Sequence, residues 1–370
     1  MRVLVTGASG LLGRAVAEAV LAAGHEVRTF QRRPSGVFGV SDVLGSITDP
    51  AALARAVDGM DAVVHLAAKV SLAGDPAEFD TVNVGGTRAL IAALTSAPAD
   101  AAPDAATPAA PASAPDTATP TETTAATDAA TAVASPAAVA RRLVYVSSPS
   151  VAHAGASIVG EGAMPADPAG ARGDYARTKA EAELLALAAD SPNLRVVAVR
   201  PHLVWGPGDT QLVARVVERA RSGRLPLLGH GAALIDSTYI DNAASGIAAA
   251  LEQAEYVHGR AYVITNGEPR PVAELLAGIC AAAGVRAPGW RVPAGLARTA
   301  GSAIEAVWRI RPGVDEPPMT RFLAEQLSTA HWFDQRQTRA DLRWVPAVSL
   351  DEGLRRLALS YAADSGPKTP

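Results

Sequence analysis

The first thirteen residues join a short apolar run to a glycine-rich turn and a helical pattern. Residues 2–6 (RVLVT) predict a buried strand, and residues 7–13 follow as GASGLLG. A buried strand that passes through such a turn into a helix is the opening of a βαβ unit whose helix N-terminus can receive a pyrophosphate. The chain therefore begins as a dinucleotide-binding sheet would begin.

Strands and helices alternate over the first 200 residues. After the first strand, strands are expected at 25–30 (HEVRTF), 61–68 (DAVVHLAA), 141–148 (RRLVYVSS) and 194–201 (LRVVAVRP). Helices are expected at Leu11–Ala23, 78–97 and 174–190. This alternation predicts an α/β fold, a Rossmann-type doubly wound parallel sheet with helices on both faces.

The pattern changes after residue 204, which predicts a smaller, mostly helical C-terminal substrate lobe. Within this part, ALIDSTYI (233–240) indicates a short strand, and DNAASGIAAALEQ (241–253) a helix capped by Asp241 or Asn242. AYVITN (261–266) indicates a strand that rejoins the main sheet. The expected division is a Rossmann domain of residues 1–204 and 239–266, a lobe of 205–238 and 267–360, and a flexible tail of 361–370.

One segment, residues 97–140, consists almost entirely of Ala, Pro, Thr, Ser and Asp and lacks aromatic residues, Leu and Ile. Such a composition buries too little apolar surface to offset the entropy of ordering the chain. We expect a disordered surface insertion, either a neutral expansion or a partner-binding segment.

Composition excludes several classes of protein. A net charge of −4 offers no basic footprint for nucleic acid. The single cysteine, Cys280, allows no intrachain disulfide, is expected to fill a core, and fits a reducing cytoplasm. We expect no signal peptide, no transmembrane span and no metal site, and a cytoplasmic enzyme that is at most attached to a membrane surface.

The glycines of the turn have distinct expected tasks. Gly7 permits the tight turn, Gly10 lets the backbone approach a pyrophosphate, and Gly13 lets the helix pack against the sheet. Ser9 and Leu11 lie between them and belong to the same expected cofactor site. The alternative is a glycine-rich turn without a ligand.

The end of the second strand bears on the choice of cofactor. An acidic residue there binds the ribose 2′-hydroxyl of NAD, but this chain reads TFQRRP, with Arg32 and Arg33 and no acid. A guanidinium pairs well with a phosphate dianion. The sequence therefore favours NADP(H) over NAD(H), with Arg32 the better candidate, the alternative being that one arginine is solvated surface.

A catalytic centre is expected from Ser148, Tyr175 and Lys179. Tyr175 and Lys179 lie four residues apart on a predicted helix, so they share a face. A nearby ammonium favours the phenolate and lowers the pKa of the phenol, which suits proton donation to a developing alkoxide. Ser148 ends a predicted strand, where its hydroxyl can hold a carbonyl oxygen; Ser147 and Ser150 remain alternatives, as does a plain surface pair for Tyr175 and Lys179.

Together, TGASGLLG, NVGGTRAL, YVSSPSV, YARTK and RPHLVWGPGD resemble the extended short-chain dehydrogenases/reductases, in particular the 3β-hydroxysteroid dehydrogenase-like branch. The resemblance implies that Ser148, Tyr175 and Lys179 are the catalytic triad and that Lys179 also binds the nicotinamide ribose. It further implies cofactor contacts from Ala67, Ala68 and Asn83, with Pro201 and Leu203 passing near the nicotinamide. In the segment that contacts adenine, the family often has Asp where this chain has Ser46, followed by Ile47, so that contact is in doubt.

Three further segments, LIDSTYIDNAA, ITNGEP and EPPMTRFLAEQLSTAHWF, look like the 2-alkyl-3-oxoalkanoate reductases of bacterial long-chain olefin biosynthesis. That resemblance implies NADPH-dependent reduction of a lipid-like β-keto acid to a hydroxy acid, which then passes to a β-lactone-forming partner. A homodimer and a complex with enzymes of the same pathway are expected.

Other functions remain open at this point: a 3β-hydroxysteroid dehydrogenase-like activity, a nucleotide-sugar epimerase or dehydratase, and a non-catalytic dinucleotide-binding redox sensor. The amphipathic segment 296–310 either touches a membrane or partner or packs onto the lobe. Candidates for a substrate carboxylate are His202, Arg270 and Arg321. An apolar substrate cleft, or equally an ordinary lobe core, would be lined by Leu225, Leu227, Leu228, Leu234, Trp308 and Phe322.

Overall fold

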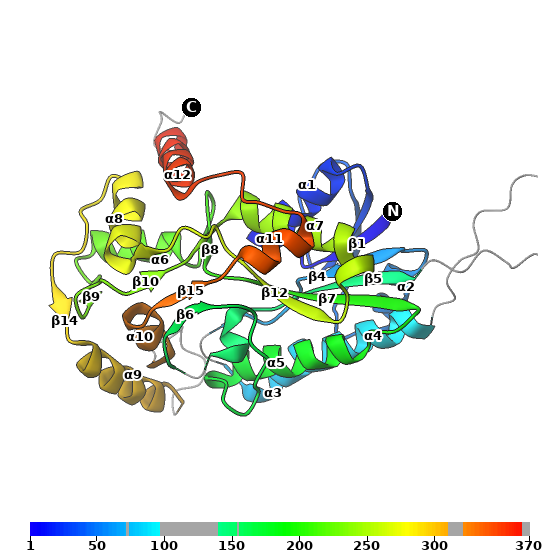
Figure 1. Cartoon of the computed structure of the whole chain (residues 1–370), viewed down its shortest axis with the longest axis horizontal. Coiled ribbons are helices and arrows are strands. Elements are labelled where there is room, and N and C mark those ends of the chain that lie inside the picture. Colours follow the sequence, from blue (N-terminus) through cyan, green and yellow to red (C-terminus); the bar gives the residue numbers. More distant parts are fainter. Residues whose placement is uncertain (72–73, 97–139, 154, 310–320, 365–370) are drawn as a thin grey trace, which may run out of the picture.

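The computed structural model describes residues 1–71, 74–96, 140–153, 155–309 and 321–364, with side chains to residue 304 in the helix that precedes the gap at 310–320 (Figure 1). The insertion predicted at 97–140 lies outside the described residues except for its final position. The prediction that it is disordered therefore stays a prediction.

A seven-stranded sheet, parallel throughout, forms the centre of the molecule. Its order is β12-β7-β5-β4-β1-β2-β3, so the chain winds outward from β1 in one direction and then from β4 in the other. The Rossmann-type α/β fold is thus confirmed, including the return of the strand predicted at 261–266. The strands are β1 Arg2–Thr6, β2 Glu26–Gln31, β3 Ser41–Leu44, β4 Ala62–His65, β5 Arg141–Val146, β7 Leu194–Pro201 and β12 Arg260–Ile264.

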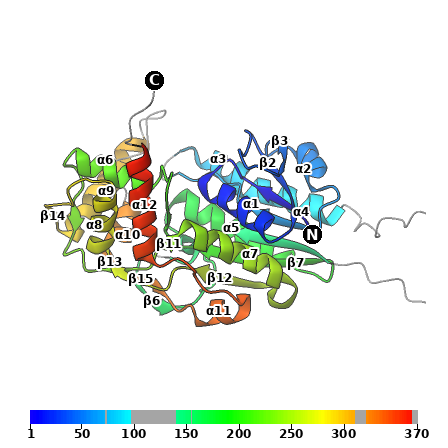
Figure 2. The same cartoon turned by 90° about the horizontal axis from the view of Figure 1, so that it is seen from above.

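Helices cover both faces of this sheet, as Figure 2 shows. On one face, α1 (Leu11–Ala22) packs beside α7 (Ile240–Val257), and the side chains of both join a cluster of buried Val, Ala and Ile from the strands. On the other face lie α2 (Pro50–Val57), α4 (Gly86–Ser96) and α5 (Gly173–Ala188). Because the central strands are buried on both faces, their sequences are continuously apolar.

The structure corrects two local predictions around residue 240. Helix α7 begins at Ile240 with Tyr239 as its N-cap residue and no capping side chain, so neither Asp241 nor Asn242 caps it. The Asn242 amide is instead buried and binds the Val348 carbonyl and Asn266. Segment 233–240 forms two short strands in separate sheets, β10 (Leu234–Ile235) and β11 (Thr238–Tyr239), because the backbone turns at residues 236–237.

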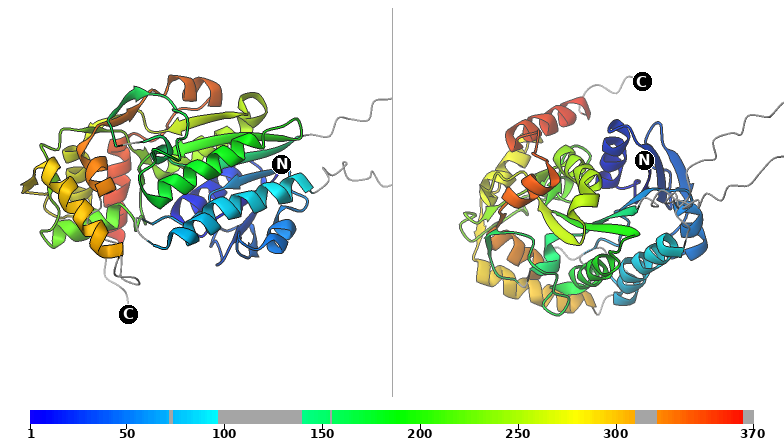
Figure 3. Two further views of the ribbon diagram at one scale, coloured as in Figure 1. Left: turned by 90° about the horizontal axis from the view of Figure 1, so that it is seen from below. Right: turned by 45° about the vertical axis from the view of Figure 1, so that its right-hand side comes forward.

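A second, mostly helical body lies beside the carboxyl ends of the strands (Figure 3). Its core joins apolar side chains of α6, α8 and α12, and Cys280 is buried there as predicted. The helices are α6 Val213–Arg221, α8 Val272–Ala282, α9 Ala294–Arg309, α10 Arg321–Ser328 and α12 Leu350–Asp364.

The final helix corrects the predicted tail. Helix α12 continues to Asp364, and Tyr361 packs against the lobe core, so residues 361–364 are helical and the tail cannot begin at 361. Residues 365–370 lie outside the described part of the chain. Helix α11 (Arg336–Leu342) packs on α7, with Leu342 and Trp344 in the apolar cluster of the Rossmann sheet.

A small four-stranded sheet connects the two bodies. Its order is β13-β10-β15-β6, from strands β13 (Arg270–Pro271), β10, β15 (His331–Phe333) and β6 (Ile158–Glu161). Strand β6 follows the loop after β5, whereas its neighbour β15 comes from the far end of the chain. Two further strand pairs, β8 (Val204–Trp205) with β11 and β9 (Leu227–Leu228) with β14 (Arg291–Val292), shape the lobe. Among the described residues, no helix is both long and apolar enough to cross a membrane.

Candidate active site

The glycine-rich turn between β1 and α1 is packed so closely that two of its glycines tolerate no side chain. Gly7 has φ +80°, and a Cβ there would lie 2.9 Å from the Ala67 backbone nitrogen. A Cβ on Gly13 would lie 2.2 Å from the Gly7 carbonyl oxygen. The turn and the first helix can therefore approach the sheet only with glycine at these positions.

Gly10 differs from its neighbours because it has room for a side chain within the protein. A Cβ at Gly10 would lie 3.5 Å from the Gly7 carbonyl, an ordinary contact. Gly10 is the N-cap residue of α1 and supplies no capping side chain, so Leu11 and the residues after it open the helix with unpaired backbone N–H groups. These donors and the partly buried Ser9 next to them fit a pyrophosphate.

Two side chains hold the loop after β4, which contains Ala67 and Ala68, against this turn. The Thr6 hydroxyl accepts the backbone N–H groups of Leu66 (3.2 Å) and Ala67 (3.1 Å). Buried Asn83 accepts the N–H of Lys69 (2.7 Å) and donates to the Thr178 hydroxyl (3.0 Å) on α5. Asn83 lies in η1 (Asp80–Gly85), a π-helical turn between α3 (Pro76–Phe79) and α4, and it joins the loop after β4 to the helix of Tyr175.

Arg32 and Arg33 directly follow β2, the neighbour of β1 in the sheet, and both are exposed. Gln31 occupies the end of the strand, where its amide donates to Asp42 at 3.0 Å. Ser46 bonds Thr48 (2.7 Å), and Ile47 is buried where it limits the space beside Gly86. No acid follows β2 directly, so the two guanidinium groups are the charges nearest in sequence to that edge.

Ser148 and Tyr175 meet at the carboxyl end of the sheet. Ser148 is the N-cap of η2 (Pro149–Ala152), its hydroxyl accepts from Ser150 at 2.9 Å, and it lies near enough to the Tyr175 phenol to lower the pKa of that phenol. The Ser147 hydroxyl is buried without a hydrogen-bond partner among the described residues. Of the three candidate serines, Ser148 is thus the one that the structure brings to the phenol.

Lys179 lies one turn after Tyr175 and is buried. Its Nζ donates to the Val146 carbonyl at 2.6 Å and lies 4.2 Å from the centre of the Tyr145 ring. Burial lowers the pKa of Lys179 to about 7, with the carboxylate of Glu183 acting in the opposite direction. Glu183 is itself buried in an ion pair with Arg200, whose Nε donates to it at 2.9 Å.

The expectation that Lys179 lowers the pKa of the phenol is not met in the structure. Burial raises the pKa of Tyr175, and the nearby Ser148 hydroxyl acts against that shift. The ammonium is turned to the Val146 carbonyl instead. The phenol therefore stays protonated at neutral pH, ready to act as an acid.

The strand beside this centre ends in an unusual backbone conformation. Pro201 closes β7, and Leu203 has φ +45°, in the left-handed region that a residue other than glycine seldom adopts. Its carbonyl accepts the Thr238 N–H at 3.2 Å, which joins this turn to β11. The two residues expected near the nicotinamide thus lie on a strained turn held from both sides.

The other predicted substrate residues fall into three groups. Leu225, Leu227 and Leu228 are buried in lobe cores, whereas Leu234 is exposed. The side chains of Trp308 and Phe322 lie outside the described part of the chain. Arg270 forms ion pairs with Asp351 and Glu268, and Arg321 pairs with Glu325, whereas His202 is buried and donates to the Asp236 carbonyl.

Sequence reasoning missed the side chains that position this centre, namely Thr6, Thr178 and the Arg200–Glu183 pair. A hydroxyl at the end of β1 and another between Tyr175 and Lys179 are visible in the sequence, but their partners lie far along the chain. Among the described residues, no group of three or more His, Cys, Asp or Glu side chains is arranged to hold a metal ion.

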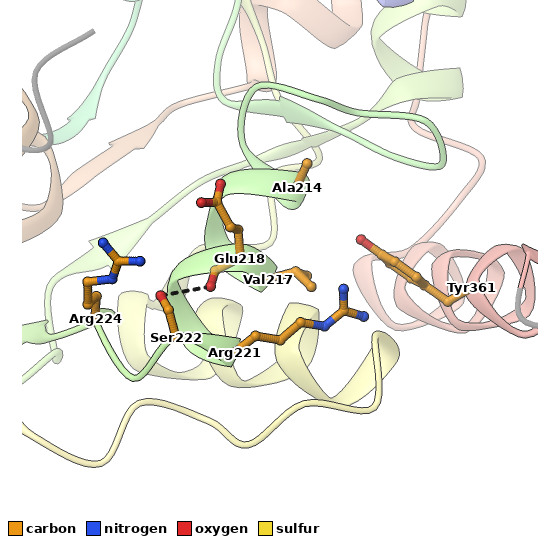
Figure 4. Close-up of a pocket in the computed structure, with 7 residues that line it drawn as sticks. All are labelled: Ala214, Val217, Glu218, Arg221, Ser222, Arg224 and Tyr361. Carbon is orange, nitrogen blue, oxygen red and sulfur yellow. Dashed lines mark hydrogen bonds between the residues drawn. The ribbon is translucent and has the colours of Figure 1, made fainter. Parts of the chain in front are cut away.

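A hollow of about 480 Å³ lies on the lobe, lined by α6 and by Tyr361 of α12 (Figure 4). Tyr361 reaches toward Val217 and Arg221, and the Ser222 hydroxyl bonds back to the Glu218 carbonyl. None of Ser148, Tyr175, Lys179 and the glycines of the turn lines this hollow, so it is separate from the candidate active site.

Comparison with known proteins agrees with this geometry. Residues 3–265 match the model of the NAD dependent epimerase/dehydratase family. The chain belongs to that family. The chain is 39% identical to the 2-alkyl-3-oxoalkanoate reductase of Stenotrophomonas maltophilia, over 98% of its own length and 100% of the relative's. It is 35% identical, over 96% of its length and 85% of the relative's, to the reductase of the same name from Shewanella oneidensis.

More distant similarities follow the same pattern. The chain is 27% identical to the 3-beta-hydroxysteroid dehydrogenase of Mycolicibacterium neoaurum, over 98% of its length and 92% of the relative's. A short-chain dehydrogenase/reductase superfamily protein from Agrobacterium tumefaciens with bound NAD has the same fold, with a TM-score of 0.65 and 22% identity over 98% of both chains. Extended short-chain dehydrogenase/reductase membership and the 3β-hydroxysteroid dehydrogenase-like kinship are thereby confirmed.

The two helix-turn glycines give a matched pair of substitutions. Gly13→Ala places a Cβ against the Gly7 carbonyl and should lower the free energy of unfolding by about 1–3 kcal/mol, the usual cost of overpacking. Gly10→Ala has space and should leave the melting temperature near that of the wild type, but weaken NAD(P)H binding because its methyl group would occupy the space in front of the N-terminus of α1. Urea unfolding and a fluorescence titration with NADPH measure both. Unchanged NADPH affinity in Gly10→Ala would remove Gly10 from the cofactor site.

Burial of Lys179 predicts a pH-dependent stability. Because its pKa falls from 10.5 in the unfolded chain to about 7 when folded, the unfolded state binds more protons between these values, and stability rises with pH through that window. Lys179→Met should therefore melt at a higher temperature than the wild type at pH 7, with the difference shrinking toward pH 10. Thermal unfolding over this range is the measurement. Lys69→Met, which removes a lysine from a surface ion pair, is the control, and an equal trend in it would contradict the assignment.

Proposed function

We propose that this protein is an NADP(H)-dependent oxidoreductase that reduces the 3-keto group of a long-chain 2-alkyl-3-oxoalkanoate to the 3-hydroxy acid. The observation that carries the chemistry is the proximity of the Ser148 hydroxyl to the Tyr175 phenol at the carboxyl end of β5, with the buried Lys179 one helical turn away. The substrate class follows the reductases at 39% and 35% identity, which match nearly the whole chain.

In this proposal, Tyr175 donates its phenolic proton to the oxygen of the substrate carbonyl as that oxygen gains negative charge. Ser148 donates a hydrogen bond to the same oxygen and holds it beside the phenol. Lys179 places a positive charge in a buried setting and stabilises the phenolate that is left after proton transfer. NADPH supplies the hydride when it is bound.

The cofactor is assigned to residues that surround the turn between β1 and α1. Gly7, Ser9, Gly10, Leu11 and Gly13 receive the pyrophosphate, and Arg32 and Arg33 receive the 2′-phosphate of NADP(H). Toward the adenine lie Ser46 and Ile47. Toward the nicotinamide lie Ala67, Ala68, Asn83, Tyr175, Lys179, Pro201 and Leu203.

The product of this reaction is a β-hydroxy acid, which in olefin biosynthesis passes to an enzyme that closes a β-lactone. We therefore place the protein in such a pathway as a homodimer in the cytoplasm, alone or in a complex with neighbouring enzymes. Contact with a membrane surface, where a lipid-like substrate would partition, fits the same placement.

Arg32 provides the test of the cofactor. Arg32→Ala should weaken NADPH binding about 10- to 100-fold, the loss expected for charge-assisted hydrogen bonds of about 1.5–3 kcal/mol, and leave NADH binding nearly unchanged. Titrations of both nucleotides by fluorescence measure the two affinities. Equal losses for NADPH and NADH would show that Arg32 does not bind a 2′-phosphate.

The decisive assay follows NADPH oxidation with synthetic 2-alkyl-3-oxo acids, a 3-ketosteroid and nucleotide sugars in parallel. We expect turnover with the oxo acids, and loss of at least about 1000-fold in Tyr175→Phe with NADPH binding retained, since general acid catalysis contributes factors of this order. Turnover of a nucleotide sugar together with tightly bound NAD(H) after purification would instead identify an epimerase or dehydratase. Full activity in Tyr175→Phe would exclude the phenol as the acid.

A further inference from the structure

Three buried histidines from distant parts of the sequence meet near the catalytic serine. The ring centres of His153 and His331 are 4.5 Å apart in an edge-to-face arrangement, and His202 lies 6.1 Å from His331. Each of the three is less than a tenth exposed. We call these residues the histidine cluster.

The topology places this cluster beside the reacting group. His153 directly follows η2, the short turn whose N-cap is Ser148. His202 directly follows β7, the neighbour of β5, and therefore lies at the same edge of the sheet as Ser148. His331 begins β15 in the small sheet that joins the lobe to the loop after β5.

Two ring nitrogens of the cluster have no partner. His153 Nε2 and His331 Nδ1 are buried and make no hydrogen bond with any residue that the structure describes. The remaining contacts fix the other rings: His202 Nδ1 donates to the Asp236 carbonyl at 2.5 Å, and His331 Nε2 bonds the Thr329 hydroxyl at 3.1 Å. Buried polar atoms without partners cost free energy, so two of them side by side indicate a place prepared for a polar ligand group.

Two buried carboxylates, Glu325 and Asp236, lie beside the cluster. From α10, Glu325 faces His153 and is paired with Arg321 at 2.8 Å and, across to the start of α5, with Arg172 at 3.9 Å. Asp236, behind His202, accepts from the Thr265 hydroxyl (2.7 Å) and the Gly267 N–H (3.1 Å). Burial lowers the pKa of His202 to about 4 and that of His331 to about 3, and it also lowers the pKa of His153, so the rings are neutral at pH 7.

We propose that His153 and His331 bind the carboxylate of the substrate through their two unpartnered ring nitrogens, with His202 packed behind them. This inference rests on the proposed function, since it names the part of the 2-alkyl-3-oxoalkanoate that the site recognises. In such an acid the carboxylate is attached to the carbon next to the keto group. A group that binds it must therefore lie beside the residues that hold the carbonyl oxygen, as His153 does on the loop of Ser148.

The chemistry of the rings suits this task. His153 can donate from Nε2 as a neutral ring. The Thr329 hydroxyl donates to the Glu325 carbonyl and so accepts from His331 Nε2, which means that His331 Nδ1 becomes a donor to the second carboxylate oxygen only when the ring takes up a proton. A bound carboxylate also favours the protonated imidazole, so binding should raise the histidine pKa and take up protons. An ester or ketone without the carboxylate gains neither interaction.

The test compares an acid with its methyl ester in the direction of oxidation, which uses the more stable hydroxy compounds. NADPH formation is measured with a 2-alkyl-3-hydroxy acid and its ester in the wild type, His153→Phe and His331→Phe. Phe keeps the ring volume and removes the donor. We expect kcat/KM for the acid to fall about 10- to 100-fold in each variant, as for a lost charge-assisted hydrogen bond, and the ester to change less than about threefold. His258 precedes the amino end of β12, whereas the cluster lies at the carboxyl ends of the strands. His258→Phe is therefore the control and should change kcat/KM for neither the acid nor the ester.

Binding separates this inference from the proposed function. Calorimetry of the hydroxy acid with Tyr175→Phe and NADP⁺, in buffers of different ionisation enthalpy, should show proton uptake that disappears when His153→Phe or His331→Phe is added. Equal losses for acid and ester, or acid binding unaffected by the histidine substitutions, would overturn the carboxylate assignment even if Tyr175 is the acid. Failure of the wild type to act on the hydroxy or oxo acids at all would overturn the proposed function, and the binding result would still decide whether the histidine cluster receives a carboxylate.

Discussion

The hydrogen bond from the Lys179 ammonium to the Val146 carbonyl connects the helix that carries Tyr175 to the end of strand β5, two residues before Ser148. It is made by a cation whose burial lowers its pKa to about 7, so the protein keeps a costly group at this junction. The Tyr145 ring lies against the ammonium, and Asn83 joins the same helix to the loop after β4 through Thr178. Turn, loop, strand and helix are therefore held as one unit around the phenol.

Around that unit, the turn between β1 and α1, the loop after β4 and helix α1 contact one another through their backbones. Gly7 and Gly13 allow the turn, the β4 loop and α1 to touch, and the Thr6 hydroxyl joins β1 to the loop. The Arg200–Glu183 ion pair, buried on β7 and α5, fixes the helix from its other side. A centre held by such close contacts and buried hydrogen bonds suits a reaction that depends on the placement of a proton donor and a hydride.

Much of the fold was predictable because it depends on the spacing of apolar residues within short segments of the sequence. Buried parallel strands are continuously apolar, so β1, β4, β5 and β7 could be predicted. Tyr175 and Lys179 could be predicted as a pair from their spacing on one helix. What could not be predicted depends on partners far along the chain. Asn242 was expected to cap a helix, but the distant Val348 carbonyl provides a buried partner that outweighs the capping role. His153 and His331 are separated by 178 residues, and only the pairing of β6 with β15 brings them together. The pKa of Tyr175 was misjudged for the same reason, since spacing shows that Lys179 is near but not that its ammonium is engaged by a carbonyl.

The small sheet that joins the two bodies also determines how the protein can be divided. Its strand β6 comes from the middle of the chain and is covered along one edge only by β15, which is made near the C-terminus. During synthesis, β6 therefore has no strand partner until residues 331–333, which form β15, have been synthesised. A fragment that stops after β12 would keep that edge permanently, and with it a template for pairing with other chains. The two bodies are thus separate in shape, but the Rossmann half depends on a strand from near the C-terminus to complete its folding.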